Sequence, residues 1–545
     1  MNREGNRLAL IACAWSIALL LASFALGCRS NHSPGHDSFA AGKLANDPVP
    51  TSKIPPASIG SARVAPTDLT SYIDSQIDDS DSAFARWGVC VISLNDGQTL
   101  YSRNADKLFT PASNMKIYTT GVALDLLGAD YHWRTSVYAN SQPDASGAVN
   151  GEFVLYGRGA PDLVSQNRED NSASLSQLAE DLYKRGLRRV RGNVIGDESY
   201  FRGDALGDGW QWTDVQWYFG AEPSALSING NEIDVNILTP DKTDEPPVVN
   251  VSGTDGYVTL QNRMVTVKRG ERLSIGIERG LSDNGVRVWG EFPLGSKGYG
   301  ARLSVHNPAL SAANLFVSAL KAHGITIDGA AQSRDSRTPR SERFDPSRAT
   351  ELAFVSSKPL SEIVKTTNKE SVNLDAELIL RTLGRERSEM LPAPEPGGKE
   401  RGDDEAGAAL IRLWLSRAGI STQNIALHDG SGLSRLDLVT PESTTRLLIA
   451  ISKTASSQVF RESLPISGRD GTLRGRLKTL TDRISAKTGS LTYDNSLSGY
   501  VTASNGQVLA FSVMCNDQTG RMSSTRVIDQ IVSILSAYPR SEAQK

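Results

Sequence analysis

Cysteine and histidine are scarce in this sequence. Its 545 residues include 4 cysteines, Cys13, Cys28, Cys90 and Cys515, and 6 scattered histidines. No two cysteines are close enough in sequence to form a zinc pair, and no His-Glu-x-x-His string occurs. Neither a disulfide scaffold nor a metalloenzyme is therefore supported.

An excess of charge of either sign is also lacking. Lys and Arg total 58 against 61 Asp and Glu, a net charge of −3, which gives no electrostatic reason to expect a nucleic acid as partner. Hydrophobic residues make up 39 % and charged residues 22 %, close to the average of globular proteins. A chain of this length predicts two or more domains.

One long uncharged run stands at the N-terminus. Arg3 and Arg7 precede the uncharged residues 8–27, and we interpret residues 1–27 as a signal peptide. The string Ala25-Leu26-Gly27-Cys28 resembles the lipobox of bacterial lipoproteins, which makes Cys28 the candidate for lipidation. Another cleaved signal and an uncleaved anchor remain alternatives. All three predict an exported protein, periplasmic or extracytoplasmic, and the first predicts a lipid anchor in the membrane.

Two stretches are rich in small residues and proline. Residues 28–66 contain no apolar period and cannot bury enough surface to offset the loss of chain entropy. We expect a flexible, lipid-anchored tether there. A second such stretch runs from Arg385 to Gly402.

Strand patterns occur at both ends of the remaining chain. Residues 87–94 and 99–101 flank Asn95-Asp96-Gly97, which predicts a hairpin. Near the C-terminus, residues 485–491, 498–503 and 507–514 also look like strands, with Asn505-Gly506 as a hairpin turn, and an amphipathic helix follows them. We expect one α/β (α+β) domain whose antiparallel sheet is completed by the C-terminal segment.

Helices and a β-rich region are predicted between these ends. Thr110 is placed to cap a helix that starts at Pro111 and ends near Gly128. Short strands and Gly-rich turns fill residues 131–300, and further helices are expected at 308–323, 359–383 and 405–418. The β-rich middle is therefore interpreted as a large insertion.

Ser113 and Lys116 fall at the start of the first predicted helix. The i, i+3 spacing places the hydroxyl and the amine on one face, where a desolvated lysine can act as the base that activates a serine nucleophile. Lowering the pKa of a lysine to near 8 costs about 3 kcal/mol, which burial and a second cation can supply. Taken alone, a solvated Ser and Lys is the more common explanation of this string.

Two further motifs carry polar side chains that suit the same chemistry. Ser371-Val372-Asn373 can relay a proton and hold a substrate carbonyl, although a helix cap is the preferred explanation when the motif is taken alone. Lys487-Thr488-Gly489-Ser490 lies on a predicted strand, where it offers a cation and hydroxyls to a carboxylate. The alternative explanation of this motif is an ordinary exposed edge strand, whose lysine prevents edge-to-edge aggregation.

The three motifs together form the set of penicillin-binding proteins and serine β-lactamases. Other segments narrow the resemblance to the D-alanyl-D-alanine carboxypeptidase/endopeptidase family (class C low-molecular-mass penicillin-binding proteins). These segments are Asp429–Ser434, Leu464–Leu473, Gln216–Tyr218 with Ser224–Ser227, and Asn307–Leu310. About 250 residues separate Ser113 from Ser371, and the resembled family carries an insertion there for which a β-lactamase has no room.

The resemblance implies a penicillin-binding/β-lactamase-like transpeptidase domain and an exported serine DD-peptidase that needs no metal or cofactor. It implies residues 67–128 and 304–540 as the discontinuous peptidase domain and 129–303 as the inserted β-rich part. Peptidoglycan stem peptides are the implied substrate, cut at D-Ala-D-Ala or cross-link bonds, and β-lactams the implied inhibitors. Its implied catalytic residues are Ser113, Lys116 and Ser371, and its implied substrate-binding residues are Asn373, Lys487, Thr488 and Ser490.

Two departures from the family pattern and two rival functions remain. Ala160 stands where an acidic residue is expected, and Val372 stands where Asp is frequent. A non-catalytic peptidoglycan-binding lipoprotein and a serine esterase or β-lactamase on the same fold are the alternatives. The preference for carboxypeptidase or endopeptidase activity is open.

Cys90 and Cys515 fall in the first and last strands of the predicted sheet. If these strands are antiparallel neighbours, as the resemblance implies, the two Cα atoms should lie within about 10 Å. A disulfide is one outcome, and two buried free thiols are the preferred one.

Overall fold

A computed structural model describes residues 69–538, except 168, 171, 240–241, 254–255, 340–342, 394–400 and 521–523. The described residues all belong to one compact unit. The predicted signal peptide, Cys28 and the tether lie outside the described residues, as does part of the stretch from 385 to 402. No helix in the described ranges is long and apolar enough to cross a membrane.

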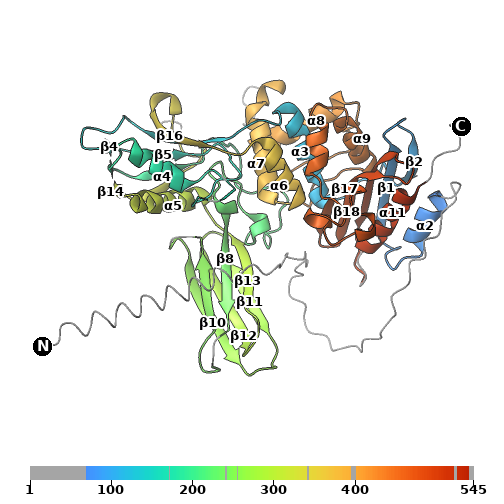
Figure 1. Ribbon diagram of the computed structural model, residues 1–545, viewed down its shortest axis with the longest axis horizontal. Coiled ribbons are helices and arrows are strands. Elements are labelled where there is room, and N and C mark those ends of the chain that lie inside the picture. Colours follow the sequence, from blue (N-terminus) through green and yellow to red (C-terminus); the bar gives the residue numbers. More distant parts are fainter. Residues whose placement is uncertain are drawn as a thin grey trace. The chain divides into compact units, whose positions relative to one another are not determined.

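The two ends of the described chain meet in one antiparallel sheet of five strands (Figure 1). The strand order is β17-β18-β19-β1-β2, so that the first strand of the chain pairs with the last. A turn with Gly97 at φ 73° joins β1 to β2. These strands are β1 (Arg86–Ser93), β2 (Thr99–Arg103), β17 (Ile484–Leu491), β18 (Asp494–Thr502) and β19 (Val508–Asn516). The prediction that the C-terminal segment completes the sheet is confirmed.

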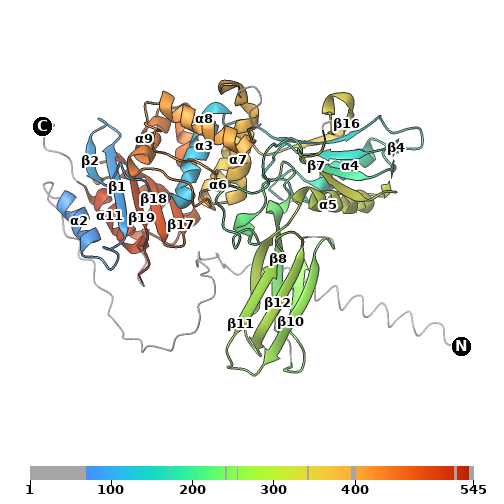
Figure 2. The ribbon, with the colours of Figure 1, turned by 180° about the vertical axis from the view of Figure 1, so that it is seen from behind.

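Helices cover both faces of this sheet. On one face, α2 (Leu69–Asp78) and α11 (Thr525–Ala537) pack on alternate residues of β1, among them Trp87 and Val89. Figure 2 shows these two helices beside the sheet. The helices that share a core with the other face are α3 (Met115–Leu126), α6 (Leu360–Lys369), α7 (Asn373–Glu386), α8 (Asp403–Arg417), α9 (Pro441–Ile451) and α10 (Ser457–Ser463).

Two helix predictions need correction near the motifs. The stretch 359–383 is two helices, α6 and α7, because Ser371 has φ 60° and Val372 is extended between them. Thr110 caps no helix: residues Ala112–Asn114 form a 3-10 turn and α3 begins after it. The backbone N–H of Thr110 instead donates to Oδ1 of Asn516 at 2.8 Å, which fastens the turn to β19.

The region between α3 and α6 holds four further sheets. A mixed sheet has the order β15-β7-β5-β3-β16, and a small one the order β14-β6-β4. Two three-stranded sheets, β10-β12-β11 and β13-β8-β9, share a separate apolar core. The elements are β3 (Arg134–Ala139), β4 (Ala148–Asn150), β5 (Phe153–Tyr156), α4 (Leu175–Lys184), β6 (Arg189–Arg191), β7 (Val194–Asp197), β8 (Glu232–Leu238), β9 (Val248–Ser252), β10 (Thr259–Val267), β11 (Ser274–Arg279), β12 (Gly285–Pro293), β13 (Tyr299–Ser304), α5 (Pro308–Ala322), β14 (Thr326–Ile327), β15 (Ala331–Arg334) and β16 (Thr350–Ser356).

The mixed sheet extends past residue 303, where we expected the insertion to end. β15 pairs with β7 and β16 pairs with β3, so strands from before and after residue 303 form one sheet. We therefore propose that the inserted region continues to about residue 356. It carries the helices α4 and α5 in addition to the expected strands.

Cys90 and Cys515 lie on adjacent antiparallel strands, as predicted, but are not bridged. Cys90 pairs with Ser512 and Cys515 with Trp87, a three-residue offset that separates the Cα atoms by about 11 Å. This is slightly more than the 10 Å we expected. The two thiols also face opposite sides of the sheet, since Cys515 shares a core with Trp87 and Cys90 does not. Both are free and buried.

Candidate active site

Ser113 and Lys116 lie one turn apart where the 3-10 turn runs into α3. Nζ of Lys116 is 3.0 Å from Oγ of Ser113. The same nitrogen donates to Oδ1 of Asn373 at 2.6 Å and to the backbone carbonyl of Ser431 at 2.9 Å. The side chain of Lys116 is completely buried. The first and second predicted motifs are therefore brought together at this one nitrogen.

Burial governs the protonation of Lys116. Removal from water lowers the pKa of Lys116 to about 8, although the carboxylates of Asp429, Glu377 and Asp375 act in the opposite direction. A substantial fraction of neutral amine is then present at mildly alkaline pH. A neutral amine 3.0 Å from a hydroxyl can accept its proton.

Ser371 and Lys487 form the second contact between the predicted motifs. Nζ of Lys487 donates to Oγ of Ser371 at 2.8 Å and to the carbonyl of Thr488 at 2.9 Å. Burial lowers the pKa of Lys487 well below its usual value, and the charge of Lys116 adds to this effect. Ser371 has a left-handed backbone between α6 and α7. The N-cap of α7 is Val372 and no side chain caps this helix, so the helix-cap explanation of Ser371 is wrong.

Strand β17 runs along the turn that carries Ser113. A Cβ added at Gly489 would come within 2.2 Å of Oγ of Ser496, 2.7 Å of the carbonyl of Pro111 and 2.9 Å of Nδ2 of Asn114. Only glycine permits this approach. β17 is an edge strand of its sheet. Its first residues are bridged to Pro465–Ser467 on the outer side, whereas residues 487–491 pair with no further strand among the described residues, so this part can pair with an extended peptide.

The hydroxyls of the third motif have partners of their own. Oγ1 of Thr488 donates to Oγ1 of Thr472 at 2.8 Å, and Oγ of Ser490 donates to Oδ1 of Asn495 at 3.0 Å. Ser490 is exposed. The structure thus places Thr488 and Ser490 on the same strand as Lys487, without a direct hydrogen bond to Ser113 or Lys116 among the described contacts.

The loop 429–434 supplies a functional group that sequence reasoning missed. Gly432 has φ 81°, and a Cβ there would come within 1.8 Å of the carbonyl of Ala112, so the loop packs directly on the turn before Ser113. The carbonyl of Ser431 is thereby presented to Lys116. A carbonyl of the backbone cannot be recognised from the residue type. The spacing of the glycines in this loop is the feature of the sequence that could have indicated its close packing on the Ser113 turn.

Buried carboxylates hold this loop in place. Oε1 of Glu377 accepts from the N–H groups of Gly430 (3.0 Å) and Ser431 (2.8 Å). Asp429 accepts from the N–H groups of Gly432 (2.6 Å) and Ser434 (2.7 Å). Burial, together with the charge of Asp429, raises the pKa of Glu377 to about 8. The loop is therefore fixed by acids that also face Lys116.

Asn373 is held at both ends of its amide. Its Oδ1 faces Lys116, and its Nδ2 donates to the backbone carbonyl of Phe219 at 2.8 Å. Phe219 belongs to the 3-10 turn η3 (Tyr218–Gly220) of the inserted region. The insertion therefore contributes directly to the environment of the motif residues, which the sequence did not indicate.

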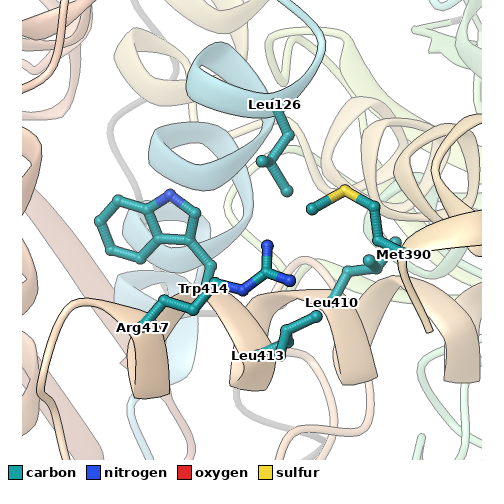
Figure 3. A pocket seen from close by; sticks show the side chains of 6 residues that line it. All are labelled: Leu126, Met390, Leu410, Leu413, Trp414 and Arg417. Atoms are coloured by element: carbon teal, nitrogen blue, oxygen red, sulfur yellow. The ribbon is translucent and has the colours of Figure 1, made fainter. Parts of the chain in front are cut away.

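A small pocket lies at the other end of α3 (Figure 3). Leu126 ends the twelve-residue helix that Met115 begins, so this pocket is about 18 Å from the Ser113 turn. Its lining residues are Leu126, Met390, Leu410, Leu413, Trp414 and Arg417. It holds none of the predicted motif residues. Among the described residues, no group of three or more His, Cys, Asp or Glu could hold a metal ion.

The geometry suits acyl transfer through a serine ester. It provides a hydroxyl beside a buried lysine of lowered pKa and a second hydroxyl beside a second buried lysine. The edge strand β17 carries Lys487 and packs on the turn that carries Ser113. These are the parts that nucleophilic catalysis with general base assistance requires.

Comparisons with known proteins agree over nearly the whole described chain. The sequence pattern of the D-Ala-D-Ala carboxypeptidase 3 (S13) family matches residues 69–538. A D-alanyl-D-alanine carboxypeptidase of Actinomadura sp. (strain R39) is 32% identical over 489 residues, which cover 88% of this chain and 86% of that protein. The D-alanyl-D-alanine carboxypeptidase DacB of Haemophilus influenzae is 26% identical over 448 residues, which cover 80% and 87%.

Solved structures show the same fold. The crystal structure of penicillin binding protein 4 (dacB) of Haemophilus influenzae superposes with a TM-score of 0.71 at 24% identity, covering 85% of this chain and 97% of that one. Its complex with a β-lactam gives a TM-score of 0.65 at 22% identity, with coverage of 86% and 97%.

Proposed function

The chain belongs to the D-Ala-D-Ala carboxypeptidase 3 (S13) family and is a serine D-Ala-D-Ala carboxypeptidase, and from this premise we propose that Ser113 is its nucleophile and Lys116 its general base. The observation that carries the assignment is the 3.0 Å contact between Nζ of Lys116 and Oγ of Ser113. The complete burial of that lysine lowers its pKa to about 8.

In the proposed acylation step, Oγ of Ser113 attacks the carbonyl carbon of the penultimate D-alanine. Its proton passes to the neutral amine of Lys116, and the C–N bond to the terminal D-alanine breaks. Ser371, held by Lys487 at 2.8 Å, gives its proton to the leaving amine and is reprotonated by Lys116, so that the proton taken from Ser113 ends on the released D-alanine. Water then attacks the Ser113 ester and releases the shortened peptide, so that the enzyme returns to its starting state.

The negative charge that develops on the carbonyl oxygen during the attack must be stabilised by hydrogen-bond donors. We assign this role to the backbone N–H groups of Ser113 and Ser490, each worth about 3 kcal/mol in comparable sites. The hydroxyls of Thr488 and Ser490 bind the terminal carboxylate beside Lys487. Asn373 orients the peptide. The close packing at Gly489 supports this arrangement because it holds β17 against the nucleophile turn.

We further propose peptidoglycan stem peptides as substrates and β-lactams as covalent inhibitors. The support is the family membership and the β-lactam complex of the Haemophilus influenzae protein. Endopeptidase cleavage of D-Ala-diaminoacid cross-links uses the same bond chemistry and belongs to this proposal. Purified peptidoglycan dimers and pentapeptides, digested in parallel and separated by chromatography, distinguish the two activities.

Export and anchoring through Cys28 are also proposed, on the lipobox resemblance alone. Metabolic labelling with a radioactive fatty acid should label the full chain and leave a Cys28→Ser variant unlabelled. Equal labelling of both chains would contradict lipidation at this residue.

The non-catalytic binding protein is the less favoured alternative. A binder has no use for two buried lysines, each of which costs desolvation energy, and Lys116 and Lys487 are both completely buried beside serine hydroxyls. Release of D-alanine from a synthetic peptide ending in D-Ala-D-Ala tests the point. The wild type should release it and Ser113→Ala should not, whereas binding without release would favour the alternative.

A further inference from the structure

Arg279, the last residue of β11, is a buried cation in the inserted region. It is 2 % exposed. Its guanidinium donates to the carbonyls of Gly280 (2.6 Å), Asp283 (3.0 Å) and Val215 (2.8 Å), and to Oγ of Ser304 (3.0 Å). Within the described part of the chain it forms no ion pair.

A buried guanidinium without a counter-charge is unfavourable unless its donors are well occupied. Here neutral oxygens accept from both terminal nitrogens of the guanidinium, whereas Nε is buried without a hydrogen-bond partner. Two of these acceptors, the Val215 carbonyl and Oγ of Ser304, fix the segment that begins at Val215. Oγ of Ser304 also donates to the Val215 carbonyl at 2.5 Å, and its N–H donates to the carbonyl of Gln216 at 3.0 Å. The N–H of Arg279 completes the set by donating to Oε1 of Gln216 at 3.3 Å.

The fixed segment leads directly to the active site. Trp217 forms a β-bridge with Leu303 and is followed by the turn η3. Within that turn, the carbonyl of Phe219 accepts from Nδ2 of Asn373. Gly220 packs so tightly that an added Cβ would come within 2.3 Å of the carbonyl of Asp214. The position of the Phe219 carbonyl is therefore set by the strands β11 and β13.

This carbonyl determines which end of the Asn373 amide faces Lys116. An acceptor at Phe219 requires the NH2 group of Asn373 on that side, and Oδ1 then lies 2.6 Å from Nζ of Lys116. A flipped amide would direct N–H groups at the lysine, which is itself a donor, and would leave the Phe219 carbonyl facing an oxygen.

We propose that Arg279 is a positioning residue for the peptidase reaction, which acts by holding residues 215–219 so that the Phe219 carbonyl fixes the amide of Asn373 against Lys116. The inference rests on the proposed roles of Ser113 and Lys116. It gives the inserted strands β11 and β13 a part in catalysis although they carry none of the motif residues.

The readout is the pH dependence of acylation as well as its rate. The charged groups that face Lys116 are Lys487 on β17, Asp375 and Glu377 on α7, and Asp429 in the loop after α8. A change at Arg279 leaves all of them in place. Loss of the Oδ1 acceptor removes an interaction that favours the ammonium form, so the acidic limb of the rate profile should move to lower pH.

The experiment measures acylation by a fluorescent penicillin, from pH 6 to 10, in the full chain. Arg279→Gln should acylate at least about tenfold more slowly at its optimum, with its acidic limb shifted to lower pH. Ser304→Ala, which keeps the guanidinium, should shift the limb in the same direction by less. Arg287→Gln is the matched control, because Arg287 is exposed on the neighbouring strand β12 and pairs with Glu278 at 3.0 Å.

The outcomes distinguish a failure of the positioning role of Arg279 from a failure of the proposed function. If the wild type is acylated and Arg279→Gln matches it in rate and pH limb while losing only thermal stability, the positioning role is wrong and the proposed function stands. If Arg279→Gln does not fold, Ser304→Ala decides by the same criterion. If the wild type itself is not acylated, the proposed function fails.

Discussion

Nζ of Lys487 lies 2.8 Å from Oγ of Ser371. The two residues are separated by 116 positions in the sequence and come from an edge strand and from the break between two helices. Because Lys487 is buried and lies near the charge of Lys116, its pKa is well below the usual value for lysine. The pair can therefore pass a proton, which a solvated lysine of ordinary pKa would do poorly.

Replacing Lys487 should impair this transfer. Lys487→Gln should lower the acylation rate by about 100-fold or more, because the Ser371 hydroxyl loses the donor that orients it. Stopped-flow measurement with a chromogenic β-lactam gives the rate, and Lys478→Gln at an exposed position is the control. A change of less than threefold in Lys487→Gln would remove the Ser371–Lys487 pair from the mechanism.

Lys116→Arg tests the general base. A guanidinium cannot accept a proton at accessible pH, so the variant should keep its fold and lose at least 100-fold in acylation rate. Circular dichroism verifies the fold, and Lys107→Arg, at an exposed site, should behave as wild type. Near-normal acylation of Lys116→Arg would move the base role to another residue, with Lys487 the first candidate.

The rate of acylation should rise with pH through about 8. The pKa of Lys116 is lowered to about 8 by burial, so the amine is protonated and inactive as a base below that value and becomes neutral above it. The pseudo-first-order rate constant at limiting β-lactam concentration, measured in steps of half a pH unit, traces this limb. A profile that is flat between pH 6.5 and 9.5 contradicts a lysine base.

Glu377 links pH to stability. Burial and the charge of Asp429 raise its pKa to about 8 in the folded protein, from 4.5. The folded state thus holds a proton that the unfolded state releases between about pH 4.5 and 8, and stability contributed by this group falls as pH rises through that window.

Glu377→Gln removes this titration and retains an oxygen acceptor for the N–H groups of Gly430 and Ser431. Its melting temperature relative to wild type should therefore increase between pH 5 and pH 9. Differential scanning fluorimetry at both pH values measures the difference, with the exposed Glu362→Gln as control. A difference that is constant or that decreases toward pH 9 would be inconsistent with a raised pKa.

Gly489 tests the approach of β17 to the nucleophile turn. Gly489→Ala places a Cβ at 2.2 Å from Oγ of Ser496 and 2.7 Å from the Pro111 carbonyl, so β17 must move away. We expect at least a tenfold loss of acylation with a modest loss of stability. Gly475→Ala is the matched control, since nothing lies within 4 Å of its Cβ. Full activity of Gly489→Ala would show that the spacing is not needed.

Much of the fold could be predicted from local patterns. Strand-like residues in 485–514 and the Asn95-Asp96-Gly97 turn indicated the strands of the main sheet, because β-branched and aromatic residues favour strands and such a turn joins antiparallel neighbours. A helix start or interruption at Ser371-Val372-Asn373 was predictable, but the backbone conformation of Ser371 was not. Ser371 has a left-handed backbone, and its side chain contacts Lys487, a residue 116 positions away that the local sequence does not indicate.

The active site, too, could be predicted from the sequence only in part. Side chains of the three motifs were identifiable because their chemistry is unusual in combination, and the structure brings Ser113, Lys116 and Asn373 together as well as Ser371 and Lys487. The carbonyls of Ser431 and Phe219 were missed. Any residue can supply a carbonyl, so its role is visible only once the chain is folded.

The assignment of Ser113 as nucleophile is tested most directly by intact-mass spectrometry after incubation with benzylpenicillin, followed by peptide mapping. The wild type should gain the mass of one benzylpenicillin molecule, carried by the peptide that contains Ser113, and a folded Ser113→Ala variant should gain none. An adduct that persists in Ser113→Ala, or one that maps to another peptide, would contradict the mechanism.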